Sequence, residues 1–400
     1  MGEAIIGRGI RILRGDIIKK TMVFLICIII LFSSINFVLC TDIGNQKKNK
    51  QGLNEEDIPI IDEEKPTPPG SKRTIDAGRH ILEASDESPH KISRREWWYF
   101  NVFFNHPKSD LQNWAMIISF NKMARNDIRF LKRDNLFIIL YDDVGSCYNF
   151  NTLDKQRGTL QDDEPAVNIM FEKSWVRGKY PNWHIHVTND LGDFVADLDF
   201  NADFMPVWVE GRSSNLLIGG RIAGDYYIPR CKVEGDILWQ DKEYKVCGVG
   251  YHDHVWETNI PRLITRGWEW FNLHFDNGWE MYISKFNLRR FRDIYSGALI
   301  ISPNNRNLVE FNKFEITTLE SASPPELPSM IYPKKIHLEA KRDDMVLILD
   351  IDIYNTCEIV WKKARTGMFE GTSNAKGTFS WSVHTVELNG YGMSEVTKVK

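Results

Sequence analysis

The hydrophobic pattern from residue 94 onward is that of a chain of short strands. Runs rich in apolar and aromatic residues are separated by Gly, Asn, Asp and Pro, and several alternate apolar and polar positions with a period of two. Many short strands at regular spacing are typical of antiparallel barrels and sandwiches. The clearest runs are residues 97–104, 114–120, 136–141, 183–187, 194–200, 268–275, 279–286, 298–302 and 345–353.

These strands are too many for one small barrel, so the pattern predicts two units. We place residues 91–245 in a first antiparallel β-barrel and residues 246–395 in a second. Residues 41–90, which precede them, are polar, charged and proline-containing, and this composition predicts a linker.

The N-terminus carries a candidate membrane segment. Residues 23–40 are hydrophobic, and no charged residue occurs among them. Basic residues outnumber acidic ones in the preceding segment 1–22, which predicts a cytoplasmic N-terminus and an exported bulk. The hydrophobic segment is either a single-pass transmembrane anchor or a signal peptide cut after Cys40, in which case the protein is secreted.

Composition narrows the choice of partners. The chain is 42% hydrophobic and 26% charged, which indicates a globular protein. The net charge is −4 and the C-terminal part has no basic run, so nucleic acid is not an expected partner. Aromatic residues reach 12%, and large aromatic side chains suit strands, interfaces and apolar ligand pockets. Export permits disulfides, so Cys231 and Cys247, which flank a predicted hairpin, either pair or remain free thiols.

The densest group of reactive side chains is the sequence GVGYHDHVWET at residues 248–258. On an extended strand His252, His254 and Trp256 project to one face, and Tyr251 and Asp253 project to the other. Imidazole suits proton transfer near neutral pH, a carboxylate can orient it, and a tryptophan face can stabilise a cation. This combination fits acid catalysis on an alkene in a dry pocket. The alternative is a polar network that closes a barrel seam.

A metal site is a second interpretation of the histidines. His184 with His186, and His252 with His254, share strand faces, and these imidazoles with Glu257 would suit zinc or iron. Such a site requires two distant strands to meet, so our leading interpretation has no metal. The sequence also lacks a phosphate-binding loop, a dinucleotide fingerprint and a serine elbow, so we expect no cofactor.

The hairpin around Asn277-Gly278 can be interpreted in detail, because Asn-Gly favours a two-residue type I′ turn. That register places Leu273 opposite Tyr282, Phe271 opposite Ser284 and Glu269 opposite Phe286. A three-residue loop would exchange these partners. In the two-residue register Glu269, Phe271, Tyr282 and Ser284 share one face, and the other face holds Trp268, Trp270, Asn272 and His274.

Several motifs in order resemble the carotenoid 1,2-hydratase (hydroxyneurosporene synthase) and AttH-like family. They are EWWYF at 96–100, GVGYHDHVWE at 248–257, TRGWEWFNLHFDNGWEMY at 265–282, YPKKIHLEA at 332–340, MFEG at 368–371 and VELNGYG at 386–392. Members of this family have a two-domain lipocalin-like fold. The resemblance therefore implies an all-β chain with two consecutive lipocalin-like antiparallel β-barrels.

The resemblance also implies a set of acid–base residues. The family's histidine and tryptophan fall on His254 and Trp256, and its tyrosine falls on Tyr282. Its aspartate falls on Ser284, which cannot supply an acidic proton, and Glu257 stands where the family has glycine. We therefore expect Asp253 or Glu269 to act as the missing acid.

The leading hypothesis is cofactor-independent hydratase or isomerase chemistry on an apolar, isoprenoid or carotenoid-like substrate. The alternative is a non-catalytic carrier of hydrophobic small molecules at the membrane surface. The predicted catalytic residues are His254, Trp256, Tyr282, Asp253 and Glu269. The predicted substrate-binding residues are Trp97, Tyr251, His252, Trp268, Trp270, Phe271 and Ser284.

Overall fold

The protein is represented by a computed structural model that describes residues 78–79, 82–90, 93, 95–122, 134–156, 158–210, 223–257, 265–288, 297–311 and 313–399. The predicted segments 1–22 and 23–40 and most of the predicted linker lie outside these residues. Within the described ranges, no helix has the length and apolar character needed to cross a membrane.

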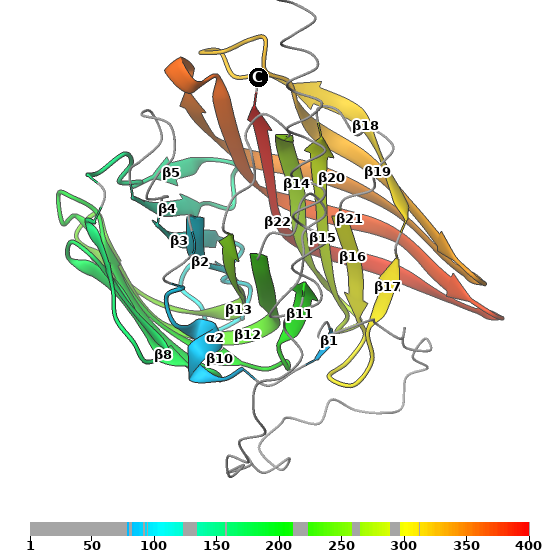
Figure 1. Cartoon of the computed structure of the whole chain (residues 1–400), viewed down its shortest axis with the longest axis horizontal. Coiled ribbons are helices and arrows are strands. Elements are labelled where there is room, and N and C mark those ends of the chain that lie inside the picture. Colours follow the sequence, from blue (N-terminus) through cyan, green and yellow to red (C-terminus); the bar gives the residue numbers. More distant parts are fainter. Residues whose placement is uncertain are drawn as a thin grey trace, which may run out of the picture. The chain divides into compact units, whose positions relative to one another are not determined.

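The described chain folds into two antiparallel sheets (Figure 1). The first has the strand order β5-β4-β3-β2-β13-β12-β10-β9-β8-β7-β6, with β11 pairing both β12 and β1. Its strands are β1 (Gly78–Arg79), β2 (Arg95–Phe103), β3 (Ala115–Lys122), β4 (Asn135–Tyr141), β5 (Cys147–Asn149), β6 (Leu160–Asp162), β7 (Val167–Phe171), β8 (Ser174–Lys179), β9 (Asn182–Thr188), β10 (Phe194–Ala202), β11 (Val207–Glu210), β12 (Ala223–Trp239) and β13 (Lys242–Glu257).

The second sheet has the order β17-β16-β15-β14-β22-β21-β20-β19-β18. Its strands are β14 (Thr265–Phe275), β15 (Glu280–Leu288), β16 (Gly297–Ser302), β17 (Val309–Phe311), β18 (Phe314–Ala322), β19 (Tyr332–Arg342), β20 (Met345–Trp361), β21 (Thr366–Trp381) and β22 (His384–Val399). A short 3₁₀ helix, η2 (Lys362–Ala364), joins β20 to β21. Both sheets curl as half-barrels, so the predicted all-β, lipocalin-like architecture is confirmed.

The chain passes from the first sheet to the second later than the predicted division between residues 245 and 246. β13 runs to Glu257 and pairs with β12 and β2 of the first sheet, and the second sheet begins at Thr265. The division of the chain into domains at 91–245 and 246–395 remains a prediction. In the structure the boundary between residues 245 and 246 lies inside β13, because the central motif continues the apolar alternation of the first sheet.

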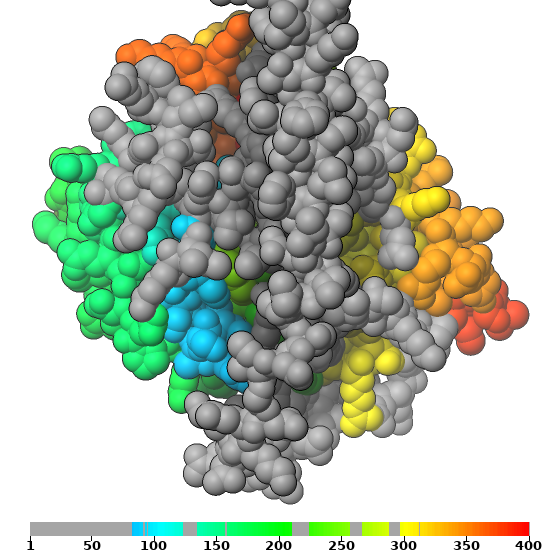
Figure 2. Space-filling model, viewed as in Figure 1, coloured from blue at the N-terminus to red at the C-terminus, as the bar shows by residue number. Residues whose placement is uncertain are grey.

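Residues 82–90 pack on the first sheet, although their composition places them in the predicted linker. They contain the single-turn helix α2 (Ala84–Glu87), and Leu82 is buried. The Glu87 carboxylate accepts hydrogen bonds from the Tyr180 backbone N–H and from Trp183 Nε1, both at 2.9 Å. The segment around α2 accordingly lies against the first sheet in the space-filling view (Figure 2).

Strand alternation sorts the buried side chains into separate cores. One apolar cluster fills the first sheet and another fills the second. A third cluster joins the two sheets, and it contains Tyr99, Tyr251, Trp270, Tyr282 and Met393. We call this third cluster the inter-sheet contact.

The predicted register of the β14–β15 hairpin is wrong. Phe275 N–H donates to Trp279 O and Gly278 N–H donates to Phe275 O, both at 2.9 Å, so three residues form the loop. Gly278 has a φ of 86°, which closes such a turn at low steric cost. Tyr282 consequently lies opposite Asn272, Ser284 opposite Trp270 and Glu269 opposite Lys285.

Cys231 and Cys247 are free thiols in the structure, as in the second alternative above. Cys231 lies opposite Gly250, and Cys247 lies opposite Glu234. Cys231 and Val246 both belong to the core of the first sheet, so the neighbouring Cys247 faces the other side. The two sulfurs therefore do not meet.

Candidate active site

β13 separates the predicted site residues into two groups. His252 and His254 are fully buried beside the first core, to which Trp256 belongs. Tyr251 belongs to the inter-sheet contact, and Asp253 shares its side of the strand. Tyr282 from β15 also lies in the inter-sheet contact. The structure therefore brings Tyr282 to Asp253 and Tyr251, and it places His254 and Trp256 on the opposite face of the same strand.

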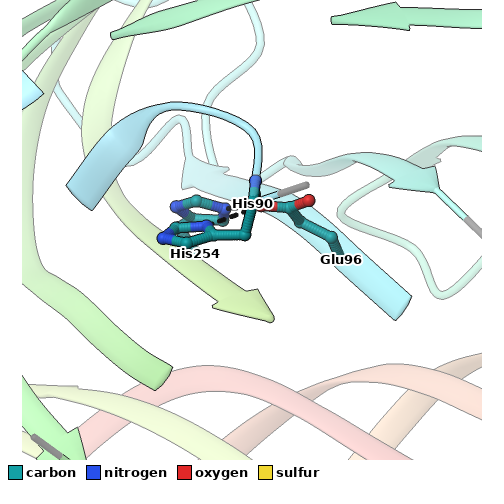
Figure 3. A group of neighbouring side chains, drawn as sticks. All are labelled: His90, Glu96 and His254. Carbon is teal, nitrogen blue, oxygen red and sulfur yellow. Dashed lines mark hydrogen bonds and ion pairs between the residues drawn. The ribbon is translucent and has the colours of Figure 1, made fainter. Parts of the chain in front are cut away.

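The first group is centred on three polar side chains, His90, Glu96 and His254 (Figure 3). His90 follows α2, Glu96 is on β2 and His254 is on β13. Glu96 Oε1 lies 2.8 Å from His90 Nδ1 and 3.1 Å from His254 Nε2. His254 Nδ1 lies 3.0 Å from the carbonyl oxygen of Asp86, which can only accept, so this nitrogen carries a proton.

Aromatic rings hold the two imidazoles in place. His254 stacks on Trp98 with ring centroids 4.6 Å apart, and His90 stacks on Trp256 at 3.8 Å. Each tryptophan ring limits the rotation of the imidazole that stacks on it. Trp256 therefore packs directly against His90.

The pKa of Glu96 is lowered, which favours its ionised form. Burial by itself raises the pKa of Glu96, but hydrogen bonds from His254 and His90 outweigh burial and bring the pKa to about 2. Burial lowers the pKa of His254, and Glu96 opposes this effect. Ser93 Oγ donates to the second carboxylate oxygen of Glu96 at 2.9 Å.

Within the described ranges these three residues are the group with ligand atoms close enough to hold a metal ion, since the atoms lie within 4.8 Å of one another. Hydrogen bonds from the His90 backbone and Ser93 already reach both oxygens of Glu96. We therefore describe the group as a hydrogen-bonded network centred on the Glu96 carboxylate.

The two HxH pairs do not meet. His184 and His186 are partly exposed on β9, where they pair with Asp199 at 2.6 Å and Asp197 at 2.7 Å. His252 is fully buried beside the first core, and its Nδ1 lies 2.9 Å from the Tyr99 carbonyl oxygen. The metal site formed from both pairs is therefore not present.

The second group is an acidic cluster within the inter-sheet contact. The Tyr251 hydroxyl donates to Asp253 Oδ2 at 3.0 Å, and the Tyr282 hydroxyl donates to Asp225 Oδ2 at 2.9 Å. Asp253 is 5% exposed, and its Oδ1 has no hydrogen-bond partner among the described residues. Burial and the neighbouring Asp225 raise the pKa of Asp253 well above its ordinary value.

Two glutamates of the second sheet complete this cluster. Glu370 of β21 and Glu395 of β22 are cross-strand partners. Burial and Glu395 raise the pKa of Glu370, and burial raises the pKa of Glu395 to about 7. We call Asp225, Asp253, Glu370 and Glu395 the inter-sheet acids. The raised pKa values of Asp253, Glu370 and Glu395 favour the neutral form of these carboxyl groups.

Aromatic rings line the inter-sheet acids. Trp270 lies at the centre, and its ring centroid is 5.3 Å from that of Tyr99, 5.4 Å from Tyr251 and 6.5 Å from Tyr282. Trp268 Nε1 donates to Glu395 Oε1 at 2.6 Å. The site thus combines neutral acids with electron-rich ring faces.

The other predicted residues occupy different environments. Glu269 Oε1 lies 3.0 Å from Lys398 Nζ, so it forms an ion pair away from the inter-sheet acids. Phe271 belongs to the core of the second sheet. Ser284 is buried opposite Trp270, and Trp97 packs against the inter-sheet contact.

Sequence reasoning missed Asp225, Glu370, Glu395 and His90. Glu370 lies in the MFEG motif, and Asp225 precedes two tyrosines and an isoleucine. A carboxylate inside an apolar strand is a signal for a buried acid. That signal does not reveal which strands bring the acids together.

The fold and site define a class of proteins with two lipocalin-like sheets and a buried acidic site between them. The sequence profile of the AttH-like family matches residues 74–397, and the chain belongs to this family. The resemblance to the AttH-like family is therefore confirmed. No curated protein matches the chain.

Solved structures share the fold at low sequence identity. The AttH protein of Nitrosomonas europaea is 14% identical with a TM-score of 0.61, over 80% of this chain and 98% of that one. Kievitone hydratase from Nectria haematococca is 15% identical with a TM-score of 0.62, over 82% and 97%. CghA is 11% identical with a TM-score of 0.54, over 83% and 94%.

Proposed function

We propose that the protein is a hydratase that adds water to a carbon–carbon double bond of an apolar, isoprenoid-type substrate at the inter-sheet acids. The observation that carries the proposal is the buried carboxyl of Asp253, which has a raised pKa and an oxygen without a partner among the described residues. A neutral carboxylic acid in apolar surroundings can protonate an alkene at neutral pH.

The reaction proceeds in two proton transfers. Asp253 donates its proton to one alkene carbon, and a carbocation forms on the more substituted carbon. The faces of Trp270 and Tyr251 stabilise this positive charge. Water adds to the cation, and its surplus proton passes to the Asp253 carboxylate, which restores the acid. Loss of a proton from a neighbouring carbon, without water, would give an isomerase.

The position of Tyr282 favours the inter-sheet acids, rather than the histidine network, as the site of the reaction. Tyr282 is the tyrosine expected from the family resemblance, and its hydroxyl donates to Asp225. His254 lies on the opposite face of β13, so one substrate cannot contact both residues while β13 lies between them. A structural relative whose name is kievitone hydratase indicates that this fold can support hydration. A carotenoid as the particular substrate remains part of the proposal.

The test uses the full chain purified in detergent, with lycopene and geranylgeraniol as a long and a short acyclic isoprenoid. The reaction is run in ¹⁸O-labelled water, and product mass is measured. The wild type should form a product heavier by one labelled water, and Asp253→Asn should lower its rate by roughly 10²- to 10⁴-fold.

Asp197→Asn is the matched control, because Asp197 is a partly exposed strand carboxylate beside His186. This control should keep the wild-type rate. Full turnover by a folded Asp253→Asn variant would refute the role of Asp253. Recovery of both isoprenoids bound but unchanged would instead indicate the non-catalytic carrier.

A further inference from the structure

Two thiols from different sheets meet at the edge of the inter-sheet contact. Cys147 is the first residue of β5 in the first sheet, and Cys357 lies in β20 of the second. Cys147 Sγ lies 4.0 Å from the carbonyl oxygen of Thr356, the residue before Cys357. Asn149 Nδ2 lies 3.6 Å from Cys357 Sγ. Each cysteine therefore contacts the backbone or side chains immediately around the other.

A bulge in β20 brings the two thiols together. The pairing of β20 with β21 is interrupted between Tyr354 and Cys357, and Asn355 has a φ of 49°. Asn355 Nδ2 donates to the carbonyl oxygen of Asp142 in the turn before β5, at 3.4 Å. Bulges redirect a strand and its side chains at a chosen point. Here the bulge places Cys357 against the start of β5.

The two sulfurs are chemically unequal. Cys357 is 2% exposed, whereas Cys147 is half-buried. The Cys357 thiol stabilises the Cys147 thiolate and lowers the pKa of Cys147 to about 7, and the same contact together with burial raises the pKa of Cys357. An accessible cysteine of low pKa beside a buried partner is the usual arrangement of an attacking and a resolving thiol.

We propose that Cys147 and Cys357 are a site of oxidative modification, where they form a disulfide that links the two sheets. The oxidant is a small-molecule disulfide such as oxidised glutathione. The Cys147 thiolate attacks one of its sulfurs and releases one thiolate. The Cys357 sulfur, after losing its proton, then attacks Cys147 and releases the second. Two protein thiols are oxidised, and one small disulfide is reduced to two thiols.

The link would stand beside the inter-sheet acids. Cys357 is the direct cross-strand partner of Glu370, and it belongs to the inter-sheet contact together with Tyr141. A covalent bond at this point restricts separation of β5 from β20. It therefore ties β5 of the first sheet to β20, the strand that pairs with β21 at Glu370.

The proposed disulfide is tested by peptide mapping. The full chain is incubated with oxidised glutathione, its remaining thiols are alkylated, and the protein is digested without reductant. Mass spectrometry should find one peptide pair joined through Cys147 and Cys357, and the pair should disappear on reduction. Cys231→Ser and Cys247→Ser should retain it, and Cys147→Ser should lose it. The oxidised protein should also unfold several degrees higher than the reduced protein, a difference that Cys147→Ser abolishes.

Mapping of the wild-type protein needs no substitution, so a variant that fails to fold does not obscure the result. Alkylation of both Cys147 and Cys357 after treatment would overturn the proposal. A glutathione adduct that persists on Cys147 while Cys357 stays reduced would also overturn it. Both results are independent of hydratase activity.

Discussion

Glu87 provides a test of how burial controls the charge of a carboxyl group in this fold. It is 1% exposed, and it accepts hydrogen bonds from Tyr180 and Trp183. Burial raises its pKa from 4.5 to about 7, because those hydrogen bonds only partly offset the loss of water. Glu87→Gln keeps the shape and an acceptor oxygen but removes the charge.

The expected magnitude follows from linkage between protonation and folding. A carboxyl with a raised folded-state pKa binds its proton more tightly when folded, so it destabilises the folded state as pH rises. The rise from 4.5 to about 7 corresponds to about 3 kcal/mol when the group is fully ionised. About 2.5 kcal/mol of this cost develops between pH 5 and pH 8.

The assay is urea unfolding of wild type and Glu87→Gln at pH 5 and pH 8, followed by tryptophan fluorescence. The difference between the two proteins at each pH removes the effects of other titrating groups. Glu87→Gln should gain about 2.5 kcal/mol relative to wild type on going from pH 5 to pH 8. Glu234→Gln, at an exposed strand position, is the control and should gain nothing. An equal difference at both pH values would refute the argument that burial dominates at Glu87.

Two further predictions concern the site. Gly224→Ala should destabilise the protein by roughly 1–3 kcal/mol in urea unfolding, because its Cβ would lie 2.0 Å from the Trp256 ring; a smaller loss would mean that the ring can move freely. Hydratase activity should be highest at low pH and fall as pH rises through the raised pKa of Asp253, because Asp253 acts only while protonated. A pH–rate profile that rises towards alkaline pH would instead indicate a base as the essential group.

The fold was predictable because strand alternation and turn residues are local signals. The central motif at 248–257 lies inside β13, the run 268–275 lies inside β14, and all but the first residue of the run 279–286 lies in β15. The hairpin register was not predictable from Asn277-Gly278 alone. Two- and three-residue loops use the same residues, and packing of Leu273 and Met281 in the second core favours the three-residue loop.

The candidate site was predictable only in part. The split of β13 into a His254 face and an Asp253 face follows from the period of a strand. The partners on each face come from other strands: Glu96 lies on β2, and Asp225 lies on β12. Because several acidic residues occur in apolar strands, only the sheet order shows which of them approach Asp253.

The two faces of β13 show why the partners of an acidic side chain, rather than the residue type, decide where an acid can act. On one face Glu96 is fully buried, but two imidazoles keep it ionised, with a pKa of about 2. On the other face Asp253 is buried beside Asp225 and Glu395, and like charges with burial favour its neutral form. A general acid must hold a proton that it can donate. The raised pKa of Asp253 favours such a state on the inter-sheet face. On the histidine face the carboxylate instead belongs to a hydrogen-bonded network that joins the segment around α2 to the first sheet.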